Sequence, residues 1–359
     1  MIILGDIAAA NKDLTKSIRN VLQENQSIFN GKTLIYNQEG LIAHTFRGQE
    51  NTPILYSSSA LLKAIKQNRK SVVATLANNH TLDLPEFFES TLVEFQKNNI
   101  KYVGAGKTRS EAMRPACFTE GGRQVFVFNF CWDFLLYHQK NPQKNIHVAE
   151  ISEDSIIRKV ERVKEEQPNS SVIVYFHWSI DLETLPYPMY REFSKALIDT
   201  GVDVVVGCHS HCVQGGEKYR DGYIVYGLGN FFIPWHIYAG GELTFPDFSK
   251  VTLALEWDLS RRKAVCHWFE YEEEDHSLKL LESDTFEHSL RLKEYSPYEN
   301  MSHEDYVTFF KENRRKKFLI PIYVDYRKQW QNKYLTFLLK LRARIARMLA
   351  KVNLIEWQH

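Results

Sequence analysis

Two histidines, His209 and His211, are separated by a single residue and follow the apolar run at residues 204–206, with Gly207 and Cys208 in between. Three consecutive valines are typical of a buried strand, so both histidines lie where that strand is expected to end. Side chains two residues apart share one face of a strand, so the pair could direct both imidazoles to the same side. The pair is therefore either ordinary loop sequence or part of a metal site that serves two ions.

Further candidate ligands also follow short β-branched runs: they are Asp6, Glu39, Asn79 with His80 beside it, and His177. Imidazole, carboxylate and amide groups together suit a borderline divalent ion such as Mn, Fe, Co, Ni or Zn. The lack of thiolates in this set argues against a structural, cysteine-rich zinc site. Cys208 stands between Gly207 and His209, and strand alternation predicts that its side chain points away from the metal and packs in the core.

The elements that must position these residues alternate between strands and helices. Strands are expected near residues 1–6, 33–40, 71–80, 171–178, 202–211 and 223–232, a hairpin-like segment at 121–130, and helices at 85–99, 152–167 and 189–201. This order predicts an α/β fold with helices on the faces of the sheet. Ligands of such sheets collect beyond the carboxyl ends of the strands, so we expect the candidates to meet at one edge.

Six short motifs along residues 1–235 together resemble one family. They are GD at 5–6, NQEG at 37–40, LANNHTLD at 76–83, FHWSID at 176–181, GCHSH at 207–211 and LGNF at 228–231. In order and spacing they are similar to the motifs of the CapA family of capsule and poly-γ-glutamate synthesis proteins. That family is a branch of the calcineurin-like metallophosphoesterase superfamily.

The resemblance implies a four-layered αββα sandwich with a binuclear metal centre at its edge. Asp6, Glu39 and His211 would bind one ion; Glu39, Asn79, His177 and His209 would bind the second, so that Glu39 bridges them. His80 would contact substrate oxygens and protonate the leaving group, with Asp83 orienting it and a metal-bound hydroxide as the nucleophile. Asn78, Asp181 and Asn230 would contact substrate or support the ligands, Asn230 through its backbone.

General physical principles support the chemistry of that assignment independently of the family. Two divalent ions about 3.5–4 Å apart lower the pKa of a shared water and clamp the oxygens of an attacked phosphoryl or carbonyl centre. A neighbouring imidazole, with an ordinary pKa near 6.5, can act as the general acid. The histidines need not be nucleophiles themselves.

The chain also departs from the pattern of the family. The superfamily commonly has Asp-x-His in the first strand, whereas here Ala8 follows Ile7, so the first ion loses a ligand. Ser179 and Asp181 stand where CapA-like proteins commonly have glycine and glutamate in HWGxE, and GCHSH stands for GHHPH. The ligands are retained while their surroundings differ, which leaves the choice of substrate open.

Each candidate also has a structural interpretation. Asp6 and Glu39 could be loop carboxylates, or Asp6 could be the N-cap of a helix that starts near Asn11. Asn78 with Asn79 could simply form a turn. His80 could be only a hydrogen-bond partner of a ligand, and Asp83 and Asp181 could be structural.

The C-terminal part of the chain is basic, although the net charge is only +1. Residues 311–351 hold thirteen Lys or Arg against Glu312 and Asp325. The composition changes between about residues 275 and 300, where EYEEEDHSLKLLESD gives way to YSPYENMSHED, so we divide the chain into a domain at 1–285 and an extension at 286–359. Apolar residues there follow helical spacing: Tyr334, Leu338, Leu341, Ile345, Met348, Val352 and Ile355, with Lys340, Arg342, Arg344, Arg347 and Lys351 around them. Such a stripe packs on the catalytic domain or a protein partner, which we favour, or lies on an anionic membrane surface.

The remaining features narrow the class of protein. The segment RRKK at 314–317 suits lipid phosphates or a polyanionic substrate, and no nucleic-acid recognition motif is present. Residues 1–10 do not resemble a secretory signal and no apolar run is long enough to span a membrane, so we expect neither a signal nor a spanning segment. The five cysteines form no CxxC pair, which favours reduced thiols. We therefore expect a cytoplasmic location, with peripheral membrane contact through residues 311–355 as an option.

Three functions fit these observations. The first is a metal-dependent hydrolase of a phosphoester or related bond in a cell-surface polymer pathway, acting on a phosphorylated or polymeric anionic substrate. The second is a non-enzymatic assembly or regulatory subunit of a capsule-synthesis complex with a vestigial metal site, and the third is a nuclease-like phosphodiesterase.

Overall fold

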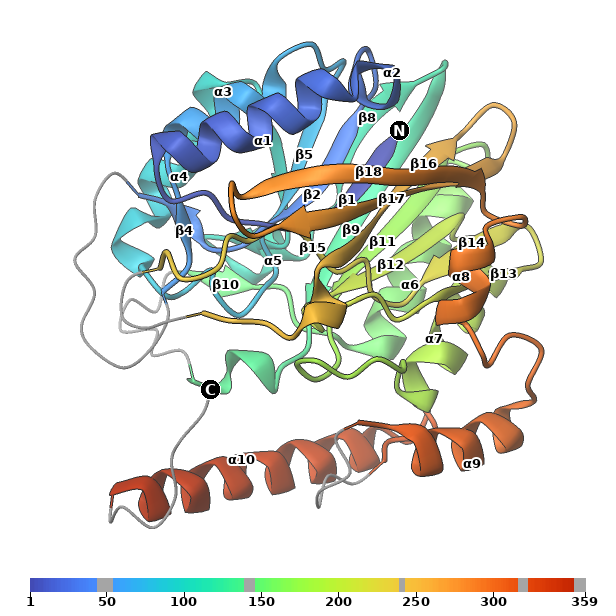
Figure 1. Ribbon diagram of the computed structural model, residues 1–359. Coiled ribbons are helices and arrows are strands. Elements are labelled where there is room, and N and C mark those ends of the chain that lie inside the picture. Colours follow the sequence, from blue (N-terminus) through green and yellow to red (C-terminus); the bar gives the residue numbers. More distant parts are fainter. Residues whose placement is uncertain (44–53, 139–145, 239–242, 316–321, 352–359) are drawn as a thin grey trace.

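The computed structural model describes residues 1–43, 54–138, 146–238, 243–315 and 322–351. Two β-sheets face each other, and helices cover the outer side of each, which gives four layers in the order αββα (Figure 1). This architecture confirms the sandwich expected from the motifs.

The larger sheet has eight strands in the order β18-β17-β16-β1-β2-β5-β6, with β15 also paired to β1. Its strands are β1 Ile2–Ile7, β2 Leu34–Gln38, β5 Val72–Thr75, β6 Lys101–Val103, β15 Asn230–Phe232, β16 Val251–Asp258, β17 Lys263–Glu272 and β18 Ser277–Thr285. Strands β1, β2, β5 and β6 are parallel, so their carboxyl ends lie at the same edge.

The smaller sheet has six strands in the order β13-β14-β12-β11-β9-β8. They are β8 Ala116–Glu120, β9 Arg123–Cys131, β11 Ser171–His177, β12 Val204–Cys208, β13 Gly216–Tyr219 and β14 Gly222–Val225. Strands β9, β11, β12 and β14 are parallel to one another, and β8 with β9 forms the predicted hairpin. Two short pairs lie outside these sheets: β3 Leu41–Ile42 with β4 Tyr56–Ser57, and β7 Ala105–Gly106 with β10 His147–Val148.

Helices form the two outer layers. Those on the side of the larger sheet are α1 Lys12–Glu24, α2 Gln26–Phe29, α3 Ser59–Lys66 and α4 Phe88–Lys97, and those on the side of the smaller sheet include α6 Glu153–Glu166, α7 Pro188–Asp199, α9 His303–Asn313 and α10 Gln329–Lys351. The short helices are α5 Arg109–Ala112, α8 Leu290–Tyr295 and the 3-10 turns Pro85–Phe87, Leu135–His138 and Asp247–Ser249.

Strand periodicity decides which side chains face the site. In β11, Val172, Val174 and Phe176 pack against the helices, whereas Ile173 and Tyr175 pack between the two sheets. Successive side chains of a strand alternate between its faces. His177, the last residue of β11, therefore continues the inner face.

One predicted strand is in fact two. Residues 223–232 were expected to form a single strand, but β14 ends at Val225 in the smaller sheet and β15 begins at Asn230 in the larger one. The connection passes from one sheet to the other through Gly227 and Gly229. Gly229 has a φ of +79°, and a Cβ on Gly227 would lie 2.8 Å from the Ser210 hydroxyl oxygen. Glycine therefore permits the crossing that the apolar pattern concealed.

The C-terminal helices pack on the smaller sheet's side of the sandwich. Tyr306 and Phe310 of α9 and Leu335 and Leu339 of α10 are buried in the same core as α6 and α7. The packed face of α10 is thus offset from the predicted stripe, whose residues Tyr334, Leu341, Ile345 and Met348 are exposed. Val352, Ile355, Lys316 and Lys317 lie outside the described residues. Among the described helices, none is long and apolar enough to cross a membrane.

Candidate metal centre

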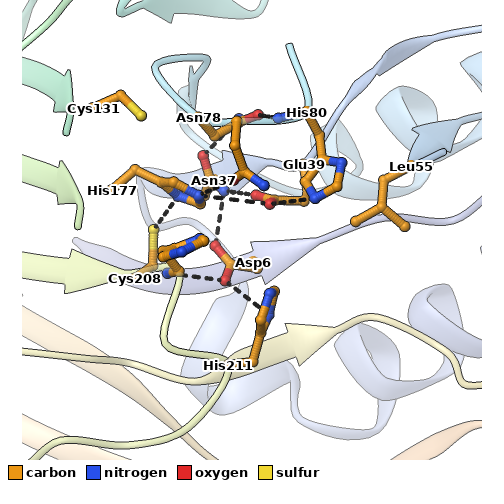
Figure 2. Close-up of polar contacts among 12 residues, drawn as sticks. Asp6, Asn37, Glu39, Leu55, Asn78, His80, Cys131, His177, Cys208 and His211 are labelled. Atoms are coloured by element: carbon orange, nitrogen blue, oxygen red, sulfur yellow. Dashed lines mark hydrogen bonds and ion pairs between the residues drawn. The ribbon is translucent and has the colours of Figure 1, made fainter. Parts of the chain in front are cut away.

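The predicted ligands meet at the carboxyl ends of strands from both sheets (Figure 2). Asp6 comes from β1, Glu39 follows β2, His177 ends β11, and His209 and His211 follow β12. All five are buried, with exposed fractions from 0% to 7%. The structure therefore brings together side chains that are as many as 205 positions apart in the sequence (211 minus 6).

A local irregularity in β1 aims Asp6 at this centre. The pairing with β2 shifts there, because Leu4 lies beside Tyr36 but Asp6 lies beside Asn37. Without that shift Asp6 would follow Leu4 onto the helix-covered face; a bulge re-aims a side chain in this way. Gly5 makes the arrangement compatible with β15, because a Cβ there would lie 1.9 Å from the carbonyl oxygen of Gly229.

Asn37 holds the two buried carboxylates together, and sequence reasoning missed it. Its side-chain amide donates to Asp6 Oδ1 at 2.8 Å and also to Glu39 Oε2. Burial raises the pKa of Glu39 well above its ordinary value, and the charge of Asp6 raises it further. Burial also raises the pKa of Asp6, although His211 opposes that shift. The signal for Asn37 was available: it is a polar residue on the inner face of a buried strand, two positions before Glu39.

One ring nitrogen of His177 faces the centre, and the other contacts the thiol of Cys208. Nε2 lies 2.6 Å from Asn79 Oδ1 and 3.7 Å from Glu39 Oε1, while Nδ1 lies 3.1 Å from Cys208 Sγ. Burial lowers the pKa of His177 well below its ordinary value, and His209 lowers it further. The imidazole is therefore neutral, which is the form that binds metals.

The prediction that Cys208 points away from the site is wrong. Cys208 pairs with His177 across β11 and β12, and its thiol lies on the inner face with Val204 and Val206. The alternation argument failed because β12 ends at Cys208, so the histidines that follow do not continue the strand. His209 and His211 have φ values of +89° and +55°. Non-glycine residues in this region are strained and cluster at functional sites.

Those two histidines are each oriented by a neighbouring side chain. His209 Nε2 lies 3.1 Å from Asp181 Oδ1, and His211 Nδ1 lies 2.7 Å from Asn230 Oδ1 and 3.8 Å from Asp6 Oδ2. Burial lowers the pKa of His209 to about 4. Asn230 was expected to act through its backbone; it does pair with Asp6 there, but its side chain also contacts His211.

His80 lies on the other side of Glu39. Its Nδ1 is 2.6 Å from Asp83 Oδ2, and its Nε2 is 3.8 Å from Glu39 Oε1. Burial alone would lower the pKa of His80, but Asp83 and then Glu39 outweigh burial and raise it to about 9. His80 is therefore a cation at neutral pH. Asp83 also accepts the backbone N–H of Leu55, which fixes the carboxylate.

The structural alternatives for two residues can now be compared with the contacts. Asn11 itself caps α1, so Asp6 is a strand residue and not a helix cap. Asn78 donates to the Gln38 carbonyl at 2.8 Å and accepts the His80 N–H at 3.0 Å, so it supports the turn, whereas Asn79 is turned toward His177.

The residues fit a divalent cation. Two buried carboxylates share one amide donor, and burying anions side by side is costly unless a positive charge compensates. Within the described residues, Glu39 Oε1 and His209 Nδ1 are buried without a hydrogen-bond partner. Two groups have ligand atoms within 4.8 Å of one another: Asp6, His177 and Cys208, and Asp181, His209 and His211. Each imidazole also has one nitrogen held by a neighbour, as metal-binding histidines usually do.

Replacing Cys208 tests whether its thiol holds the ring of His177 in place. In Cys208→Val the Nδ1–H of a metal-binding His177 loses its acceptor, so we expect the free energy of unfolding to fall by about 1–3 kcal/mol and metal affinity by about 10–100-fold. Cys208→Ser retains an acceptor and should stay close to wild type. Calorimetric metal titration and thermal melts measure both effects.

The matched control is Cys266→Val, because Cys266 is equally buried but lies in β17 away from the centre. Its metal affinity should equal that of the wild type. Equal metal affinity in Cys208→Val would show that the thiol only packs.

Comparisons with known proteins agree with this geometry. The family model described as bacterial capsule synthesis protein PGA_cap matches residues 2–234, a range that includes every residue of the candidate metal centre. The capsule biosynthesis protein CapA of Bacillus anthracis is 27% identical over 180 residues, covering 49% of this chain and 43% of that protein. The PGA biosynthesis protein CapA of Bacillus subtilis is 27% identical over 179 residues, covering 49% and 46%.

The chain thus spans about half the length of these two relatives. Among solved structures, the 5'-nucleotidase of Candida albicans is similar with a TM-score of 0.37 and 12% identity, covering 94% of this chain and 56% of that one. The sandwich itself has the four αββα layers that the motifs predicted. Because the family model covers more than half of the chain and every motif of the site, this protein belongs to the bacterial capsule synthesis PGA_cap family.

Proposed function

We propose that this protein is a metal-dependent hydrolase of a phosphoester or related bond in the synthesis of a capsule or other cell-surface polymer. The observation that carries the proposal is the set of four imidazoles around two buried carboxylates. Each imidazole has one nitrogen held by a different side chain: Asp83, Cys208, Asp181 or Asn230. A site that only packs has no need to fix every ring.

Asp6, Glu39, Asn79, His177, His209 and His211 would hold the metal, with Glu39 between the two halves of the site. When bound, two divalent ions supply an activated water and withdraw charge from the attacked group. Asn37 keeps both carboxylates turned inward, and Asn79 and Cys208 fix the ring of His177.

His80 is the candidate general acid. Its Nδ1 is held by Asp83, so its Nε2 faces Glu39 and the centre. Because the raised pKa keeps this imidazole protonated at neutral pH, Nε2 can donate its proton to the oxygen of a departing alcohol. The same positive charge favours an anionic substrate, such as a phosphorylated intermediate or an acidic polymer.

A screen of chromogenic phosphomonoesters and phosphodiesters in Mn²⁺ tests this function. We expect turnover by the wild type and none by the double variant His209→Ala, His211→Ala. Cleavage of simple phosphodiesters would favour the nuclease-like activity, and undiminished turnover in the double variant would refute the assignment of the site.

The alternative function is a non-enzymatic subunit of a capsule-synthesis complex. The observation that favours it is Ala8, a fully buried residue at the end of β1 that offers no ligand where the superfamily commonly has histidine. A single bound ion with no turnover against any phosphoester would support this alternative, whereas turnover that depends on added metal would exclude it.

A further inference from the structure

Helix α10 exposes a continuous apolar face. Its residues are Trp330, Tyr334, Phe337, Leu341, Ile345 and Met348, with exposed fractions of 65%, 54%, 59%, 41%, 49% and 69%. We call these six residues the α10 stripe. At about 100° per residue they lie within roughly 80° of one another around the helix. Among the described residues, the other large exposed apolar side chains are Val93, Tyr102 and Leu290, which are scattered.

The opposite face of α10 already packs on the sandwich. Leu335, Thr336 and Leu339 are buried, and the indole N–H of Trp132 donates to Asn332 Oδ1 at 3.0 Å. Because the helix is fixed through that face, the α10 stripe lies on the side of the helix that faces away from the core. Helix α10 itself lies along the lower edge of the molecule in Figure 1. The stripe is therefore not the face through which α10 packs on the rest of the protein.

The helix is also fixed close to the candidate metal centre. Trp132 directly follows β9, and the last residue of β9, Cys131, pairs with His177. The end of the smaller sheet that contacts α10 through Trp132 is therefore the end that carries the predicted ligand His177.

The charge of the helix is of one sign. From residue 326 to residue 351 the chain has eight Lys or Arg and no Asp or Glu. Around the helix, Lys333 lies on one border of the α10 stripe, about 40° from the outermost stripe residue on that side. Arg342 lies on the other border, about 60° from the outermost stripe residue there. Their side chains can extend past the stripe to anionic groups at the same level.

We propose that the α10 stripe binds the surface of an anionic lipid bilayer. The helix lies parallel to the membrane, with the stripe at the boundary between headgroups and acyl chains and the basic side chains at the lipid phosphates. Trp330 and Tyr334 are residue types that favour this boundary. The stripe runs from Trp330 to Met348, which is 18 residue steps or about 27 Å along the helix axis, and an elongated stripe of this kind suits a flat surface. A protein partner would need acidic residues on both borders. This inference does not depend on the proposed hydrolase activity.

Vesicle flotation of the full chain tests the proposal. Vesicles of phosphatidylcholine and phosphatidylglycerol in equal parts should carry the protein, pure phosphatidylcholine much less, and about 0.5 M salt should weaken the binding. The variant Phe337→Ser, Ile345→Ser should bind at least ten-fold more weakly. Lys333→Gln, Arg342→Gln should also bind more weakly and lose part of its salt dependence.

The matched control is Val93→Ser, Leu290→Ser, which removes two equally exposed apolar side chains from α4 and α8. It should float like the wild type, and all variants should melt at the wild-type temperature because the changed residues are exposed. Absence of vesicle binding in a monomeric wild type would overturn the proposal. A second result would also overturn it: light scattering shows a wild-type dimer, the Phe337→Ser, Ile345→Ser variant is monomeric, and neither protein binds vesicles. The stripe would then join two copies of the chain.

Discussion

Glu39→Gln is expected to stabilise the metal-free protein and to abolish its stabilisation by metal. In the metal-free state, Glu39 is fully buried and its Oε1 lacks a hydrogen-bond partner. The carboxylates of Glu39 and Asp6 both accept from the side-chain amide of Asn37, so the two acids lie close together. Glutamine has nearly the same shape and no charge, so the cost of the buried carboxylate disappears. We expect a gain of about 1–3 kcal/mol in the free energy of unfolding at pH 8.

The sign of the pH dependence follows from the raised pKa. An unfolded Glu39 ionises near its ordinary value of 4.5, and the folded group only at a much higher pH. The wild type therefore loses stability relative to Glu39→Gln as pH rises above about 4.5. Thermal melts at pH 5 and pH 8, with and without Mn²⁺, measure this difference.

The control for this substitution is Glu89→Gln, an exposed glutamate on α4 that pairs with Lys107. Neither pH dependence nor metal response should change there. A Glu39→Gln protein that is still stabilised by Mn²⁺ as strongly as the wild type would remove Glu39 from the metal site.

His80→Ala is expected to lower kcat by about 10²–10⁴-fold, which is the usual contribution of a general acid. Metal content should not change, because His80 is not among the predicted ligands. Poorer leaving groups should be affected most, since they depend most on protonation. Steady-state kinetics with phosphoesters of graded leaving-group pKa, together with metal analysis, separate this role from ligation.

The variant Asp83→Asn tests the same proton transfer from His80. The wild-type acid is active while His80 is protonated, so activity should fall at alkaline pH as His80 loses its proton. Asp83 is the largest of the influences that raise the pKa of His80, so its removal should move the alkaline fall in activity to lower pH. An unmoved pH profile in Asp83→Asn, or loss of metal in His80→Ala, would contradict the assignment of His80.

Strand patterning predicted the fold and the location of the site because both depend on where buried strands end. Asp6, Glu39, His177 and the two histidines after β12 meet as expected. The motif order added the αββα layers, which periodicity alone could not distinguish from a single sheet covered by helices.

The errors arise where the chain leaves regular structure. Cys208 was misplaced because the positive φ values of His209 and His211 break the alternation on which the prediction relied. Residues 223–232 were merged into one strand because two short apolar strands of different sheets are joined by glycines without any charged residue between them. Asn37 was missed because the search concentrated on residues that follow the ends of strands, whereas Asn37 lies within β2, two positions before Glu39.

The metal content of the purified full chain tests the central claim most directly. After removal of metal with a chelator, reconstitution with Mn²⁺ and desalting, elemental analysis should find two Mn per wild-type chain. The His209→Ala, His211→Ala variant should retain less than one, with turnover lost in parallel. Equal metal content in the two proteins, or no metal in either, would contradict a binuclear centre at this end of the sandwich.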